Sequence, residues 1–262
     1  MVDKIIVLGL DGKEKESIDV PEVFSVVPRI DLIERAVVSI LAAQKQPQGR
    51  DPLAGKKNNA ESWNTGFGVA RVPRRKGSGY PDARGAAFAP MTVKGRVTHP
   101  PRPEHTTIKR VNKKERQKAL LSAISATKVR ALVSERGHMV DEIANLPIVL
   151  DDKFQTVKKT SQIFEIFEKI GLTKELDRVK EGRTIRAGKG KSRGRKYKKK
   201  KGPLIVIKDN FGVFNAARNI PGIDVINIAN LNCNALAPGT HCGRLTIWTQ
   251  SAFNELKKYK VN

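Results

Sequence analysis

Two stretches of the 262-residue chain carry nearly all of its net positive charge, and neither has the periodicity of a strand or a helix. Residues 45 to 110 contain 14 Lys and Arg against 4 Asp and Glu, and residues 183 to 202 contain 11 basic residues and no acid. These stretches cannot form a packed core, because burying unpaired charge is strongly unfavourable. The core must therefore come from the remaining two thirds of the chain, which is close to neutral.

The near-neutral remainder alternates short apolar runs, typical of buried strands, with segments of helical periodicity. The runs at 4 to 10 and 16 to 20 flank an Asp11-Gly12 turn and predict a hairpin. Further strands are predicted at 147 to 150, 204 to 207, 224 to 228 and 244 to 248.

Helices are predicted between these strands. Asp31 with Glu34, and Asn112 with Glu115, have the spacing of helix-capping pairs, so helices are expected to start there. The first is expected to end near Gln46-Pro47. Further helices are predicted around 163 to 170, 173 to 180 and 214 to 218, and from Ser251 onward. This alternation predicts an α/β fold, with a mainly parallel sheet covered by helices on both faces.

The charge distribution divides the chain further. We expect residues 1–44 and 111–262 to form one globular α/β domain, with residues 45–110 inserted as a long irregular loop. Residues 183–202 are expected to form a second basic loop within the globular part. A structureless connection of this length is unusual unless it is functional and ordered by a partner. Fixing its backbone would cost about 1–2 kcal/mol per residue with little apolar burial, so we expect it to be disordered without that partner.

Motifs for catalysis are weak. Gly190-Lys191-Ser192 ends like a phosphate-binding loop, but Ile185 stands where that motif requires glycine, so we assign the lysine to the basic stretch. The glycines at 9 and 12 are explained by a turn. Asp151 and Asp152 follow a predicted strand, yet adjacent side chains on an extended backbone point apart. We interpret them as solvated or helix-capping carboxylates and expect no enzyme.

Metal, cofactor and membrane signals are also weak. Cys233, His241 and Cys242 match no zinc spacing, and the cysteines are expected to be buried thiols. The four histidines are His99, His105, His138 and His241, and they show no metal-binding pattern. No apolar run approaches the roughly 18 residues of a membrane span, and no signal pattern opens the chain. We therefore expect a cytosolic protein without metal or cofactor.

The charge favours a polyanionic partner, since the formal net charge is +24 and the isoelectric point is near 10.2. In the first stretch, Trp63, Phe67, Tyr80 and Phe88 are interleaved with basic residues and glycines. Arginine bridges phosphates, aromatic rings stack on unpaired bases, and glycine allows close approach. Folded RNA fits this better than DNA, because no major-groove motif is present. Two alternatives stay open: the aromatics could pin the loop onto the protein's own globular domain, and residues 196–201 could be a solubilising run.

Seven ordered motifs resemble one family, the universal large-subunit ribosomal protein L4 family in its archaeal and eukaryotic branch. They are GVARVPR (68–74), GAAFAP (85–90), VKGRVTHPP (93–101), NKKERQKAL (112–120), IRAGKGKSRGRKY (185–197), ARNIPG (217–222) and GRLTIWTQSAF (243–253). Phe67 departs from the pattern, since the family often has a basic residue there, as do Thr240 to Cys242, where a second glycine is common. The chain stops soon after its last predicted helix, so the archaeal type is indicated.

The resemblance implies a structural, non-catalytic constituent of the large ribosomal subunit in the cytoplasm. Such a protein binds large-subunit rRNA, helps subunit assembly, and extends its long loop to line part of the nascent polypeptide exit tunnel. Its implied partners are large-subunit rRNA, neighbouring large-subunit proteins and the nascent peptide, with no membrane and no homo-oligomer. An alternative is a free regulatory RNA-binding protein acting on an mRNA leader.

The residues expected to bind RNA come from both basic stretches, and the part of the long loop near 66–89 is expected to reach deepest. Those of the long loop are Trp63, Phe67, Arg71, Arg74, Arg75, Lys76, Tyr80, Arg84, Lys94, Arg96, His99, Arg102, Lys109 and Arg110. Those of the second loop are Arg183, Arg186, Lys189, Lys191, Arg193, Arg195, Lys196 and Tyr197.

Overall fold

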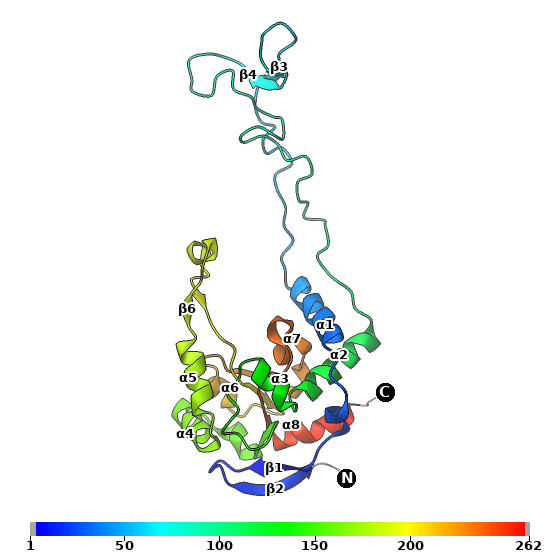
Figure 1. Ribbon diagram of the computed structural model, residues 1–262, viewed down its shortest axis with the longest axis vertical. Coiled ribbons are helices and arrows are strands. Elements are labelled where there is room, and N and C mark those ends of the chain that lie inside the picture. Colours follow the sequence, from blue (N-terminus) through cyan, green and yellow to red (C-terminus); the bar gives the residue numbers. More distant parts are fainter. Residues whose placement is uncertain (1–3, 260–262) are drawn as a thin grey trace. The chain divides into compact units, whose positions relative to one another are not determined.

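The computed structural model describes residues 4–259 (Figure 1). Its largest sheet has six strands in the order β2-β1-β5-β10-β8-β9. β1 and β2 form the predicted antiparallel hairpin, and all the other neighbours in the sheet are parallel. The strands are β1 Lys4–Leu8, β2 Glu14–Asp19, β5 Ile148–Leu150, β8 Leu204–Ile207, β9 Asp224–Asn227 and β10 Thr246–Thr249. The predicted α/β fold with a mainly parallel sheet is confirmed.

Eight α-helices occur in the described part of the chain, joined by short 3-10 turns. The α-helices are α1 Ile30–Ala43, α2 Lys113–Ala126, α3 Arg130–Glu135, α4 Thr160–Ile170, α5 Thr173–Glu181, α6 Val213–Ala217, α7 Cys233–Leu236 and α8 Gln250–Glu255. The 3-10 turns are η1 Glu22–Ser25, η2 Asp152–Thr156, η3 Lys189–Arg193, η4 Ile228–Asn230, η5 Pro238–Thr240 and η6 Leu256–Lys258.

The sheet has a hydrophobic core on each face. Trp248 of β10 packs on one face with residues of α1, α2, α7 and α8, and its ring meets those of Phe24 and Phe253. Its neighbour Ile247 points to the other face, where α3, α4 and α6 pack. Successive strand residues alternate between faces, so strands covered on both sides need apolar residues throughout. This is why β5 and β8 read as continuous apolar runs.

Most of the predicted helices and strands are present within a few residues, but the first capping prediction is wrong. α1 begins at Ile30, so Asp31 lies in its first turn, where a carboxylate still complements the helix dipole. At α2, Asn112 is the N-cap residue but its side chain makes no capping hydrogen bond. Glu115, its expected capping partner, is ion-paired with Arg35 of α1 instead. α3 and α7 were not predicted, because they span too few turns to show a periodicity.

The chain divides into two compact units. One combines the chain up to Ala42 with the part from Lys109 onward, and we call it the body. The other is Ala43–Ile108, which we call the arm. Within residues 4–259, no helix is long and apolar enough to span a membrane.

Candidate nucleic-acid interface

The arm is irregular over most of its length, as predicted, but it also contains a small antiparallel sheet that was not predicted. β3, Ala60–Ser62, pairs with β4, Pro73–Arg75 (Figure 1). A third segment joins the other edge of β4: the Arg75 amide donates to Gly85 O at 3.0 Å, and the Ala87 amide donates to Pro73 O at 2.8 Å. These backbone bonds place the two loops of the arm, residues 63–72 and 76–84, at opposite ends of one scaffold.

Arg74 holds this scaffold together from inside. Its Nη1 donates to Arg84 O at 3.1 Å and its Nη2 to Ala70 O at 3.4 Å. Its guanidinium lies 5.7 Å from the centre of the Trp63 ring, and that ring lies 5.4 Å from Phe67. Trp63 is therefore packed within the arm, whereas the Phe67 side chain is 64% exposed. These contacts of Trp63 lie within the arm, and the alternative that the aromatics pin the loop onto the globular domain stays a prediction.

Other cations of the arm are also engaged. Arg75 pairs with Asp82, Lys76 pairs with Glu61, and the Arg96 guanidinium lies 5.8 Å from the centre of the Phe88 ring. The Tyr80 hydroxyl donates to a backbone carbonyl, but the residue is 41% exposed. The remaining expected residues of the long stretch all lie on the surface: Arg71, Arg84, Lys94, His99, Arg102, Lys109 and Arg110. The last two belong to the body.

The backbone of the arm is strained beyond its short strands. Arg84, Phe88 and Lys94 have φ values of 58°, 68° and 59°, which side-chain-bearing residues seldom adopt. Gly95 packs so closely that a Cβ there would lie 2.0 Å from Ala89 O. Such conformations persist only where surrounding contacts enforce them, and they concentrate at functional sites.

The second basic stretch forms a two-stranded antiparallel ribbon, which we call the basic ribbon, residues 183–202. β6, Thr184–Ile185, pairs with β7, Tyr197–Lys198, and η3 closes the far end. All 11 basic side chains of the ribbon are exposed. Arg183 lies over the Tyr197 ring at 4.0 Å and Lys196 lies 5.6 Å from it. The Gly190-Lys191-Ser192 sequence lies in η3, in line with its assignment to the basic stretch.

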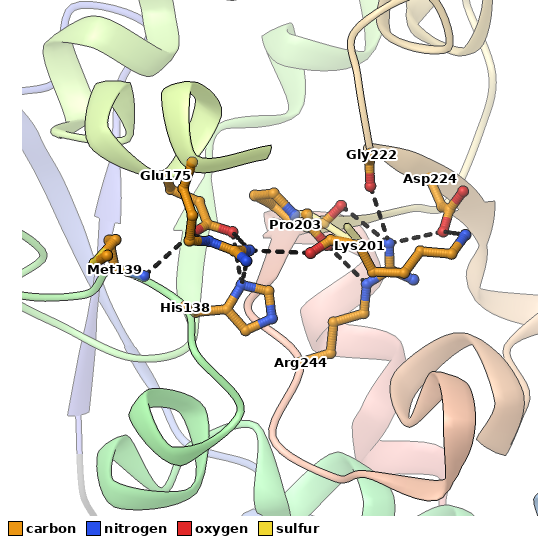
Figure 2. A network of polar contacts seen from close by, with 10 residues as sticks. His138, Met139, Glu175, Lys201, Pro203, Gly222, Asp224 and Arg244 are labelled. Carbon is orange, nitrogen blue, oxygen red and sulfur yellow. Dashed lines mark hydrogen bonds and ion pairs between the residues drawn. The ribbon is translucent and has the colours of Figure 1, made fainter. Parts of the chain in front are cut away.

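A network of buried polar groups lies where the ribbon joins the body (Figure 2). Its centre is Glu175 of α5, whose side chain is fully buried and accepts from Arg178, His138 and the Met139 amide. A second group surrounds Arg244, whose side chain is 1% exposed and pairs with Asp224 at 2.7 Å. Sequence reasoning missed this network. The only local signal is the three-residue spacing of Glu175 and Arg178 on one helix face.

Burial and pairing shift the pKa values of these groups. Burial alone would raise the pKa of Glu175, but the hydrogen bonds from Arg178 and His138 hold it below the ordinary value. The same opposition, with Arg244 and Lys201 as partners, lowers the pKa of Asp224. Burial lowers the pKa of His138 in spite of its bond to Glu175. The two carboxylates therefore stay ionised and the imidazole stays neutral at pH 7.

The other polar candidates have structural surroundings. Asp151 accepts from the Lys153 amide at the start of η2 and pairs with Lys15, in agreement with the capping interpretation. Asp152 accepts from the Ser251 amide at 2.9 Å. Cys233 and Cys242 are buried, as expected, and burial raises the pKa of Cys233 to about 11. Among the described residues, no three His, Cys, Asp or Glu side chains are grouped to hold a metal ion.

Comparison with known proteins assigns the family. The sequence model described as "Ribosomal protein L4/L1 family" matches residues 18–259. Relatives named "Large ribosomal subunit protein uL4" include that of Methanosphaera stadtmanae, which is 48% identical over 97% of this chain and 96% of its own. The relative from Methanocaldococcus jannaschii is 47% identical over 97% of this chain and 98% of its own. The relative from Methanopyrus kandleri is 44% identical over 96% of this chain and 97% of its own. The chain therefore belongs to the ribosomal protein L4/L1 family, the family that its motifs resemble.

Proposed function

We propose that this protein is a structural constituent of the large ribosomal subunit in the cytoplasm and binds large-subunit rRNA through its arm and its basic ribbon. The observation that carries the proposal is the placement of the charge. All 11 cations of the ribbon are exposed, and the arm adds a further set of exposed cations on a strained, irregular backbone. Such a surface repels itself in isolation and is neutralised by phosphates. The names of the relatives supply the ribosomal context.

In the arm, the proposed rRNA contacts are the exposed side chains. Arg71, Arg84, Lys94 and Arg102 would reach phosphates, and Phe67 and Tyr80 would stack on unpaired bases. Trp63 and Arg74 would act differently, by holding the scaffold that presents them. We further propose that the part of the arm near 66–89 lines the nascent polypeptide exit tunnel, and that the protein takes part in subunit assembly.

Neighbouring large-subunit proteins and the nascent peptide complete the proposed partners, and the proposed role is not catalytic. The body would serve as a folded base for the two extensions. The residues with perturbed pKa values support this role. Glu175 is satisfied by Arg178, His138 and the Met139 amide, and Asp224 and Arg244 are satisfied by each other and by further groups of the protein.

The test is sedimentation of a cell extract on a sucrose gradient, with this protein followed in each fraction before and after a high-salt wash. Even about six simple phosphate contacts lose roughly a thousandfold in affinity between 50 and 200 mM salt. An integral constituent is expected to stay with the large subunit through the wash. A variant in which residues 45–108 are replaced by a short Gly-Ser linker is the control, and it is expected to be washed off. Sedimentation of the intact protein mainly as a free species would support the regulatory alternative instead.

A further inference from the structure

The basic ribbon has little internal structure to determine its direction. Its strands pair at only two positions, Thr184 with Lys198 and Ile185 with Tyr197. A two-stranded hairpin is marginal in water, and 11 cations without an acid repel one another. Whatever holds the ribbon in one direction must therefore act where it joins the body.

Arg178 links the two ends of the ribbon. It lies on α5, five residues before the ribbon begins at Arg183, and its Nη2 donates to Lys201 O at 3.0 Å, where the ribbon ends. The same guanidinium is fixed to Glu175 by two bonds, Nε to Oε2 at 2.7 Å and Nη2 to Oε1 at 2.6 Å. The bond to Lys201 therefore starts from a rigid donor.

Glu175 is in turn fixed by the loop that follows α3. Its Oε1 accepts from His138 Nδ1 at 2.7 Å, and its Oε2 accepts from the Met139 amide at 3.0 Å. With the two bonds from Arg178, the carboxylate has four donors and no contact with water. Because four hydrogen bonds fix this buried carboxylate, they also fix the Arg178 guanidinium that is bonded to it.

Arg244 completes the attachment from the other side. Its Nε donates to Gly202 O at 2.9 Å and its Nη2 to Pro203 O at 3.4 Å. Together with Arg178, it supplies a donor to the carbonyls of three successive residues at the end of the ribbon. Lys201 also directs its ammonium to Asp224, at 2.9 Å, and Asp224 pairs with Arg244.

We propose that Arg178 is a positioning residue for rRNA binding: it sets the direction in which the basic ribbon leaves the body, so that the cations of the ribbon meet RNA already arranged. The inference rests on the proposed function. Arg178 touches no RNA in this scheme, because its side chain is only 13% exposed and its Nε and Nη2 groups already donate to Glu175 and Lys201 O. It acts through the ribbon, and its loss changes the entropy of binding rather than the number of phosphate contacts.

The first experiment measures the direction of the ribbon without RNA. Nitroxide labels are placed at Ser192→Cys in η3 and Gln162→Cys on α4, both exposed positions, and pulsed EPR gives the distribution of distances between them. Arg178→Met is expected to broaden the distribution, and Arg178→Lys to restore part of the order, because an ammonium can still pair with Glu175. An unchanged distribution in folded Arg178→Met would overturn the proposal.

The second experiment measures binding to a transcript of archaeal large-subunit rRNA over a range of salt concentrations. Arg178→Met is expected to weaken binding about tenfold at every salt concentration, because a ribbon without a fixed direction must lose more backbone freedom when it binds. A tenfold loss of affinity corresponds to ordering about one further backbone residue. The slope of log affinity against log salt is expected to stay the same. The matched control is Arg193→Met, which removes the same charge from the exposed end of the ribbon and is expected to reduce the slope by about 0.7–0.9.

The outcomes separate this inference from the proposed function. If Arg178→Met reduces the slope as Arg193→Met does, Arg178 contacts phosphate and the positioning role is wrong. If Arg178→Met binds as the parent protein does, the inference fails while the proposed function stands. If the parent protein does not bind the transcript, both fail.

A second variant guards against a folding defect in Arg178→Met, which leaves Glu175 buried beside fewer donors. Asp224→Asn releases Lys201 at a side chain that is 38% exposed. Its amide oxygen can still accept from the buried Arg244, which also keeps its bonds to backbone carbonyls. It is expected to broaden the distance distribution and weaken binding in the same direction while its circular dichroism spectrum stays that of the parent. A folded Asp224→Asn with the parent's distribution and affinity would contradict the attachment described above.

Discussion

Replacing Glu175 by Gln tests how far the buried network stabilises the body. The substitution keeps the shape of the side chain but removes its charge and turns one acceptor into an NH2 group. That group would face donors, because the carboxylate accepts from Arg178, His138 and the Met139 amide. Arg178 would be left with its charge buried and without a counter-ion.

The expected loss follows from burial. The Glu175 side chain is fully buried and that of Arg178 is 13% exposed, so solvent screens the pair very little. Removing one partner of a buried ion pair costs about 3–5 kcal/mol. For a domain of the size of the body, each kcal/mol lowers the melting temperature by about 2–4 °C, so a decrease of roughly 6–20 °C is expected.

The assay is urea and thermal unfolding at pH 7, followed by far-ultraviolet circular dichroism. The control is Glu142→Gln, the same substitution at an ion pair with Lys174 of the same helix α5. Those side chains are 44% and 68% exposed, so no measurable change is expected. Breaking a buried pair should cost about 3–5 kcal/mol. If the free energy of unfolding of Glu175→Gln is instead within about 1 kcal/mol of that of the parent protein, the network does not stabilise the body and the reasoning is refuted.

Three further predictions follow from single side chains. Burial lowers the pKa of the His138 imidazole below 6.5, so on acidification this imidazole is protonated in the unfolded chain before it is protonated in the folded one. The His138 contribution to the free energy of unfolding should therefore be fully present above about pH 7 and be lost as the pH falls through about 6.5. His138→Gln should remove that decline, measured as melting temperature against pH, and an unaltered slope would contradict it. Arg74→Ala should speed amide hydrogen exchange in β3 and β4, whereas Arg84→Ala, at an exposed side chain, should not. Cys233, with a pKa of about 11, should react with a thiol reagent only when the body unfolds; rapid reaction of the native protein would show that it is accessible.

The sequence by itself determined the elements whose pattern is local. β5 and β8 are short apolar runs because a strand covered on both faces needs apolar residues at every position. The hairpin of β1 and β2 follows from the turn between them. The two cationic stretches were recognisable because charge at that density cannot be buried, and the order of the motifs indicated the family. Each of these inferences uses residues that are neighbours along the chain.

Tertiary structure alone decided what each charged residue does. Arg71 and Arg74 lie three positions apart in one basic segment, yet Arg71 is exposed and Arg74 holds two backbone carbonyls beside Trp63. Glu175 and Asp224 look like any other acids in the sequence. Their partners, such as His138 and Arg244, come from distant parts of the chain. A charge that is solvated and a charge that is buried with a partner have the same letter in a sequence, because the difference lies in contacts that form only when the chain folds.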